Sequence, residues 1–280
     1  MKTEIPEELA SEVPQTKWGK ILLATPVVMT VIATLLAGLA SSEMTRAQYD
    51  RALGAQLQSK AGDQWSYFQA KKLRGAMQRS SFELLTATAD IRPIENAALG
   101  KVPAAVAPSL DSKVEAALQA VERQKPETEI ADLLKTVDDQ SLATALQAAK
   151  DNALALDSAT APASQVLDQL EKSLPAGDQA AARDLTATRM RYNAARYDAE
   201  ARLNQFIANL YELQVRKINV SAERHHKRSG KFFFGMLAAQ AAVIVSTFAI
   251  AAQKRSFLWS LAAVAGLAAV VFAIYVYLRV

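Results

Sequence analysis

Three uncharged apolar runs, each about 20 residues long, constrain the fold of this chain more than any other feature. They cover residues 21–40, 232–253 and 257–278. A helix needs about 20 apolar residues to cross a hydrocarbon core of about 30 Å, and a helix satisfies its own backbone polar groups where no water is present. The sequence therefore predicts an integral membrane protein with three transmembrane helices.

The residues between the first and second runs predict a helical insert outside the membrane. They are rich in alanine and poor in aromatic residues, and the whole chain has only 10 Gly and 9 Pro. Few apolar residues alternate with a period of two, which argues against strands. The expected fold class is an all-α membrane protein with a long antiparallel helical-hairpin or coiled-coil domain outside the bilayer.

Prolines, glycines and changes of composition divide the chain into seven expected segments. They are a flexible acidic N-terminal tail at 1–20, a transmembrane helix at 21–40, a long amphipathic helix at 41–92, an acidic helical cap at 93–177, a long coiled-coil-like helix at 178–231, and transmembrane helices at 232–253 and 257–278. The acidic leader and the length of the first run are unlike a cleaved signal peptide.

The two long helices of the insert each carry one apolar stripe. Apolar residues recur every three or four positions from Leu53 to Phe68, a one-sided pattern that buries one helix face. The returning helix has the spacing of a coiled-coil seam, with Lys217 at one seam position. The residues expected to pack between these helices are Trp65, Phe68, Leu203, Phe206, Leu210 and Leu213.

Shorter amphipathic helices fill the acidic middle. The Ser112–Glu115 spacing predicts a capping box that opens the first of them, and Pro126 restarts a second. A third is expected around 142–149 and a fourth after Pro162. Each has a thin apolar face and therefore needs a neighbour.

Charge is distributed unevenly along the insert. Residues 41–92 carry 8 basic and 5 acidic side chains (net +3), residues 93–188 carry 8 and 15 (net −7), and residues 189–231 carry 10 and 4 (net +6). Basic residues beside a bilayer attract anionic lipid, so we expect head-group contacts from Arg224, His225, His226, Lys227, Arg228 and Lys231. No basic run is interleaved with stacking aromatics, which disfavours nucleic-acid binding.

Small and polar residues in the apolar runs predict helix packing inside the membrane. Glycine, alanine and threonine at four-residue spacing let helices approach closely, and a polar side chain hydrogen-bonds to a neighbouring helix. The expected packing residues are Thr30, Thr34, Gly38, Gly235, Ala239, Gln240, Ala262 and Gly266.

The chain has no motif with the spacing of a catalytic site. Without cysteine it lacks thiolate chemistry and Cys-based metal sites. His225 and His226 are adjacent, so on a helix they point about 100° apart, and the cations around them oppose a metal ion. A pH-responsive lipid contact stays open for them. We therefore expect no enzyme activity, no cofactor and no metal.

The stretch from Asp63 to Lys71, DQWSYFQAK, resembles a motif of a bacterial membrane family known as domain-of-unknown-function family 4337. The layout of one N-terminal span, a helical insert and a C-terminal pair of spans is similar to that family. The resemblance covers residues 1 to about 92 and about 190 to 280, and the acidic middle is longer than expected for it. It implies no established activity.

Three functions fit these features. The leading hypothesis is a non-enzymatic, homo-oligomeric scaffold in a bacterial inner membrane. The alternatives are an oligomeric pore or membrane-stress sensor, and an adaptor that recruits a protein partner through the acidic cap. Lys17, Lys20, Lys254 and Arg255 favour a cytoplasmic N-terminus and a periplasmic insert by the positive-inside rule, whereas the cluster at 224–231 favours the opposite.

Overall fold

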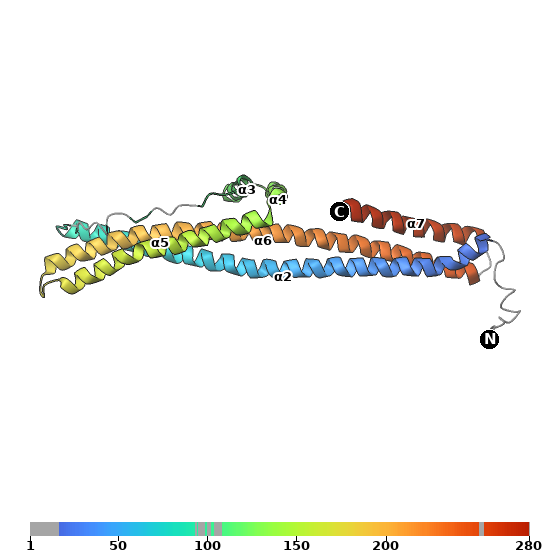
Figure 1. Ribbon diagram of the computed structural model, residues 1–280, viewed down its shortest axis with the longest axis horizontal. Coiled ribbons are helices and arrows are strands. Elements are labelled where there is room, and N and C mark those ends of the chain that lie inside the picture. Colours follow the sequence, from blue (N-terminus) through green and yellow to red (C-terminus); the bar gives the residue numbers. More distant parts are fainter. Residues whose placement is uncertain are drawn as a thin grey trace. The chain divides into compact units, whose positions relative to one another are not determined.

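The computed structural model of this protein describes residues 17–92, 94, 99, 102–103, 108–251 and 255–279. These residues form six helices and no strand, so the expected all-helical fold is confirmed (Figure 1). The helices are α2 (Lys17–Thr88), α3 (Ser112–Glu122), α4 (Glu127–Thr136), α5 (Asp139–Ser173), α6 (Gln179–Ala251) and α7 (Arg255–Arg279). Residues 1–16 of the expected acidic tail and Lys254 of the expected basic turn lie outside the described residues.

Two of the helices exceed 70 residues. α2 has 72 residues and joins the first apolar run to the amphipathic segment without a break. α6 has 73 residues and joins the coiled-coil-like segment to the second apolar run, with Gly230 inside the helix. Asp178 caps α6 as its sequence position predicts, because its Oδ1 accepts the Ala181 N–H at 3.0 Å.

Two helices in the described part of the chain, α2 and α6, are long and apolar enough to cross a membrane. The expectation of three spans is corrected here. In α7 the apolar stretch among the described residues runs from Ser260 to Val276, which is shorter than the ~20 residues that a span normally needs.

The chain divides into two compact units. The terminal unit contains Met1–Arg51 and Val220–Val280, and the central unit contains Ala52–Asn219. In the terminal unit α2, α6 and α7 meet in two apolar clusters. One cluster centres on Leu36, Ala40, Phe232 and Val276, and the other on Ala33, Ala239 and Ala269.

The central unit is built on the side-by-side contact of α2 with α6. The shorter helices cover this pair, and the largest cluster of buried apolar residues draws on α2, α3, α4, α5 and α6. Its members include Ala61, Leu118, Leu134, Leu146 and Leu210. A second cluster joins Leu99 to α5 and α6 through Leu167, Leu185 and Tyr192. Each thin apolar face thus gains the neighbour that it requires.

Two local expectations about the acidic middle are wrong. The third and fourth predicted helices form one helix, α5, with the exposed Pro162 inside it. Proline removes one backbone hydrogen bond from a helix, but the buried residues on either side of it, Leu156, Ala163 and Leu167, hold the segment against α6. The cap of α3 is Asp111 and not Ser112, because the Asp111 carboxylate accepts the Lys113 N–H at 2.9 Å.

The end of α3 stores local backbone strain. Gln124 has a φ of 52°, a left-handed conformation, while the Lys125 N–H closes the turn on the Ala120 carbonyl at 3.0 Å. Glycine is the usual residue at such a position, because a side chain there costs about 1 kcal/mol or more.

We therefore predict that Gln124→Gly raises the free energy of unfolding by about 1 kcal/mol. Hydrogen exchange of the α3 amides and the apparent melting temperature measure the gain. Gln124→Ala keeps the strain and is the matched control. Exchange in the glycine variant that is no slower than in the alanine variant would contradict the assignment of strain.

Candidate functional site

The α2–α6 contact in the central unit is fixed by polar groups as well as apolar ones. The Trp65 indole Nε1 donates to Glu212 Oε1 at 2.7 Å. The Trp65 ring also meets Phe68 edge-on, with centroids 5.5 Å apart and an interplanar angle of 82°. The sequence motif around Trp65 thus places a tryptophan against α6, and its partner is a carboxylate that the motif did not indicate.

A second set of contacts lies further along the same pair of helices. Glu200 on α6 forms ion pairs with Lys71 of α2 and, at 3.2 Å, with Arg196 of its own helix. Asp198 pairs with Arg79. All five charged groups are at least partly exposed, so these ion pairs fix the register of the two helices more than they add to stability.

Gly75 lies at the level of these pairs. A Cβ at this position would lie 3.3 Å from Asp198 Oδ1 and 3.6 Å from the Ala194 carbonyl oxygen. The second distance is ordinary van der Waals contact, whereas the first would require the Asp198 carboxylate to shift slightly, so a side chain here would disturb the Asp198 ion pair more than the backbone packing.

The expected seam of α6 lies in the core of the central unit. Leu203, Leu210 and Leu213 are buried, and Phe206 is half-buried against the largest cluster. The ammonium group of Lys217, the polar member of the seam, has two partners at this position. Its Nζ donates to the Val137 carbonyl at 2.6 Å and pairs with Asp139 at 2.5 Å.

In the terminal unit a buried carboxylate on α2 faces cations on α6. Glu43 is only 9% exposed, and its Oε2 lies 2.5 Å from His225 Nδ1. Its Oε1 lies 3.8 Å from Arg228 and 3.9 Å from Arg46. One turn away the buried Ser229 hydroxyl donates to the Ala40 carbonyl at 2.7 Å. These contacts close α2 onto α6 beside the apolar segments.

The basic run therefore has two faces. His225 and Arg228 point inward and contact Glu43, so these two side chains do not face lipid head groups as expected. Arg224, His226 and Lys227 are exposed, Lys227 beside Glu223 at 3.3 Å. Lys231 is half-buried, with its Nζ 5.9 Å from the centroid of the Tyr275 ring. Contact of these four residues with lipid head groups stays a prediction.

The residues expected to pack in the membrane fall into two groups. Gly235, Ala239, Ala262 and Gly266 are buried. A Cβ on Gly266 would lie 2.6 Å from Met29 Sδ, and one on Gly235 would lie 3.4 Å from Leu36. Thr30, Thr34 and Gly38 are exposed, as is Gln240. The threonine hydroxyls donate to the backbone one turn earlier, at 2.8 and 2.9 Å.

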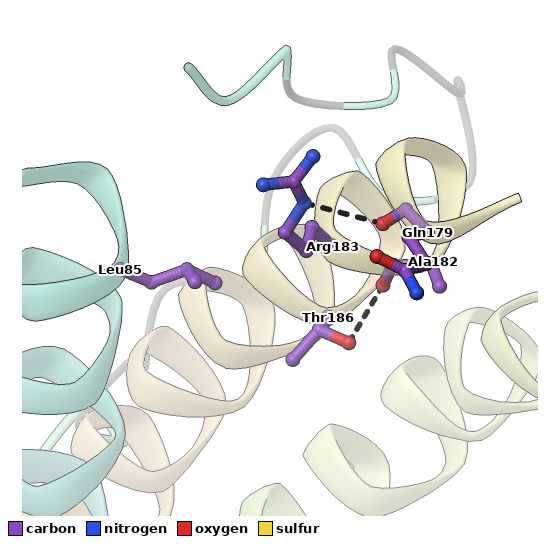
Figure 2. A pocket seen from close by; sticks show the side chains of 5 residues that line it. All are labelled: Leu85, Gln179, Ala182, Arg183 and Thr186. Atoms are coloured by element: carbon purple, nitrogen blue, oxygen red, sulfur yellow. Dashed lines mark hydrogen bonds between the residues drawn. The ribbon is translucent and has the colours of Figure 1, made fainter. Parts of the chain in front are cut away.

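A shallow depression of about 360 Å³ lies between α2 and the start of α6 (Figure 2). It is lined by Leu85, Gln179, Ala182, Arg183 and Thr186. The Thr186 hydroxyl and Arg183 Nε bond to backbone carbonyls of their own helix, at 2.7 and 3.2 Å. The depression gathers none of the predicted site residues. No group of three or more His, Cys, Asp or Glu within the described ranges could hold a metal ion.

Sequence reasoning missed Glu43, Glu200 and Glu212. Each lies in a helix whose charged side chains we expected to face solvent. Only Glu43 could have been identified from the sequence, because it stands just after an apolar run and has no acidic residue near it. The arrangement of these residues clamps α2 to α6.

Comparison with known proteins finds one family. Residues 22–168 match the family described as domain of unknown function (DUF4337). The match runs through most of the acidic middle, which the resemblance had left outside its coverage, and it ends before α6. No curated protein and no solved structure matches the chain.

The Glu43–His225 contact generates a prediction for the terminal unit. A buried hydrogen bond to a charged group contributes about 1.5–3 kcal/mol, so Glu43→Gln is expected to lower the apparent melting temperature in detergent by about 5 °C. His225→Gln is expected to cause a similar loss, and the double variant less than the sum of the two. Fully additive losses would mean that the two side chains do not interact.

Tyr192 generates a pH prediction for the central unit. Burial raises the pKa of its hydroxyl above 10.0, Glu200 adds to the rise and Arg196 opposes it; the hydroxyl also donates to the Thr160 carbonyl at 3.2 Å. Above pH 10 the folded chain holds a proton that the unfolded chain releases, so the free energy of unfolding falls as pH rises. Melting curves from pH 8 to 11 should show this fall, and Tyr192→Phe should weaken it. Tyr67→Phe, at an exposed site, should leave it unchanged.

Proposed function

We propose that this chain, which belongs to the DUF4337 family, is a non-enzymatic membrane scaffold that self-associates and holds its central unit outside a bacterial inner membrane. In this proposal α2 and α6 cross the bilayer, and α7 packs against them. The N-terminus is cytoplasmic and the central unit periplasmic, as the short basic segments suggest.

The exposure of the apolar segments carries the membrane part of the proposal. Only 17% of the apolar window of α2 and 33% of that of α6 are buried, whereas the core helix of a soluble protein would be mostly buried. Large side chains in all three helices face outward; they include Val31, Leu35, Phe234, Phe248, Val264 and Leu267. Exposing this much apolar surface to water is unfavourable, and lipid removes the cost.

Two exposed features within these segments support self-association. Gln240 is exposed on α6, and an amide that faces hydrocarbon is costly unless a neighbouring helix bonds to it. On α2 the Thr30–Thr34–Gly38 stripe is open, with nothing within 4 Å of a Cβ added at Gly38. Because the threonine hydroxyls are satisfied internally, the stripe offers a small, smooth surface to a second helix.

The acidic residues of the cap favour a scaffold over an adaptor. Asp111 and Asp138 cap α3 and α5. Glu127 pairs with Arg216 of α6, and Glu122 accepts from Asn209 at 3.3 Å. Glu127 and Glu122 hold the cap onto α6, and Asp111 and Asp138 stabilise the helices that they cap, so these four carboxylates have roles that need no basic partner.

Native mass spectrometry of the protein from mild detergent tests self-association. We expect oligomers, and we expect Gly38→Leu to shift them toward monomer because the side chain blocks helix approach. Val28→Phe adds bulk on another exposed face of the same segment and is the control. Monomers alone in the unmodified protein would refute the proposal.

A further inference from the structure

The exposed apolar surface of the terminal unit ends at one level on α2 and α6. On α2 the large exposed aliphatic side chains end at Leu39, and on α6 the large exposed apolar side chains begin at Phe233. The Ser229 hydroxyl donates to the Ala40 carbonyl at 2.7 Å, which places the two ends within about one helical turn of each other. If the apolar segments lie in a bilayer, its hydrocarbon core ends here.

An aromatic residue of α7 marks the same level independently. Val276 packs with Ala40 and Phe232 in one apolar cluster. The neighbouring Tyr275 is 53% exposed, and the Lys231 Nζ lies 5.9 Å from the centroid of its ring. Tyrosine is enriched where a membrane meets water, because its ring is apolar and its hydroxyl is polar. The lysine and the tyrosine therefore belong at the depth of the lipid head groups.

Three cations lie within reach of the head groups at this level. At 1.5 Å per residue, Lys231 and Lys227 follow Phe233 by about 3 and 9 Å, and Arg46 follows Leu39 by about 10 Å. The head-group layer is about 5–8 Å thick on each side of the core, and the long side chains of lysine and arginine extend their charge toward it. Arg46 belongs to α2, so the cations come from both long helices.

Burial of one carboxylate leaves the surface at this level positive. Residues 41–50 and 221–231 together carry five Lys or Arg and three Asp or Glu side chains, a net charge of +2 with histidine neutral. Glu43 is turned inward, where its carboxylate contacts His225 at 2.5 Å. By contrast, the side chains of Arg46 and Lys227 are 63% and 64% exposed.

The other two carboxylates at this level do not cancel the exposed cations. Glu223 lies 3.3 Å from Lys227, but both side chains are exposed, and such a pair contributes little. Asp50 is half-buried, one turn beyond Arg46. The surface therefore attracts anions, and the anions available at this depth of a membrane are lipid phosphates.

We propose that Arg46, Lys227 and Lys231 form a basic belt that binds anionic phospholipid on the side of the bilayer from which the central unit projects. This proposal rests on the membrane insertion proposed above and names the class of lipid that the protein prefers. A zwitterionic lipid carries a cation beside its phosphate, so it gains less from a positive surface than an anionic lipid does. The attraction depends on lipid charge and holds for either leaflet.

Native mass spectrometry of the full-length protein released from nanodiscs tests the basic belt. The nanodiscs contain equal amounts of phosphatidylglycerol, which is anionic, and phosphatidylcholine, which is zwitterionic, with the same acyl chains. We expect the protein to retain phosphatidylglycerol several-fold more than phosphatidylcholine. Arg46→Gln with Lys227→Gln should remove most of this preference.

A matched variant controls for the loss of net charge. Arg51→Gln with Lys60→Gln removes two exposed cations that lie further along α2, the nearer of them about 18 Å beyond Leu39. Because this distance exceeds the reach of the head groups, the lipid preference should stay as it is in the unmodified protein. All four positions are exposed, and unchanged circular dichroism is the check on folding.

The outcomes separate this proposal from the proposed function. Equal retention of the two lipids by the unmodified protein would overturn the basic belt and leave membrane insertion standing. An equal loss of preference in the two double variants would show a response to net charge alone, which also overturns it. Failure of the protein to enter nanodiscs would overturn both proposals. Oligomers are counted in the same spectra, so self-association is measured separately from lipid preference.

Inorganic phosphate distinguishes a lipid from a soluble anion as the ligand. An excess of phosphate is added to the protein in nanodiscs before release. We expect the retained phosphatidylglycerol to be unchanged, because its acyl chains hold the head group beside the cations. Displacement of the lipid by phosphate would show a site for a soluble anion and would overturn the assignment.

Discussion

The structure depends on the contact between α2 and α6. Neither helix is stable alone at such a length in water, because most helix stability in proteins comes from packing of one face. In the central unit the inner face of α2 gains that packing from α6 and the cap helices, through Leu57 and Ala61. In the terminal unit Leu36 of α2 and Phe232 of α6 pack together in one apolar cluster. The cap helices and α7 pack onto this pair.

Polar contacts set the register of this pair. Apolar stripes with heptad-like spacing tolerate a shift by one repeat, since the same kinds of side chain would meet again. The Trp65–Glu212 hydrogen bond, the Lys71–Glu200 ion pair and the Glu43–His225 contact each join a particular side chain of α2 to a particular side chain of α6. A shift would take the buried Glu43 carboxylate away from His225 and Arg228, which is far more costly than a small loss of packing.

The sequence predicted the helices correctly where the pattern on one helix face, or one helix-capping or helix-breaking residue, decided the local structure. Long segments without proline predicted α2 and α6, and the position of Asp178 predicted where α6 begins. Prediction failed where a distant contact decided the outcome. Pro162 remains inside α5 because buried residues on both sides of it pack on other elements. Likewise, the basic run from Arg224 to Arg228 gave no sign that His225 and Arg228 turn inward to Glu43.

The central claim is that this chain works as an assembly of membrane-anchored helix pairs. Single-particle cryo-electron microscopy of the full-length protein in lipid nanodiscs tests it most directly. The account predicts a symmetric particle of several copies that contact one another through their apolar segments, at the exposed stripe of Thr30, Thr34 and Gly38. A particle that contains one copy would contradict it.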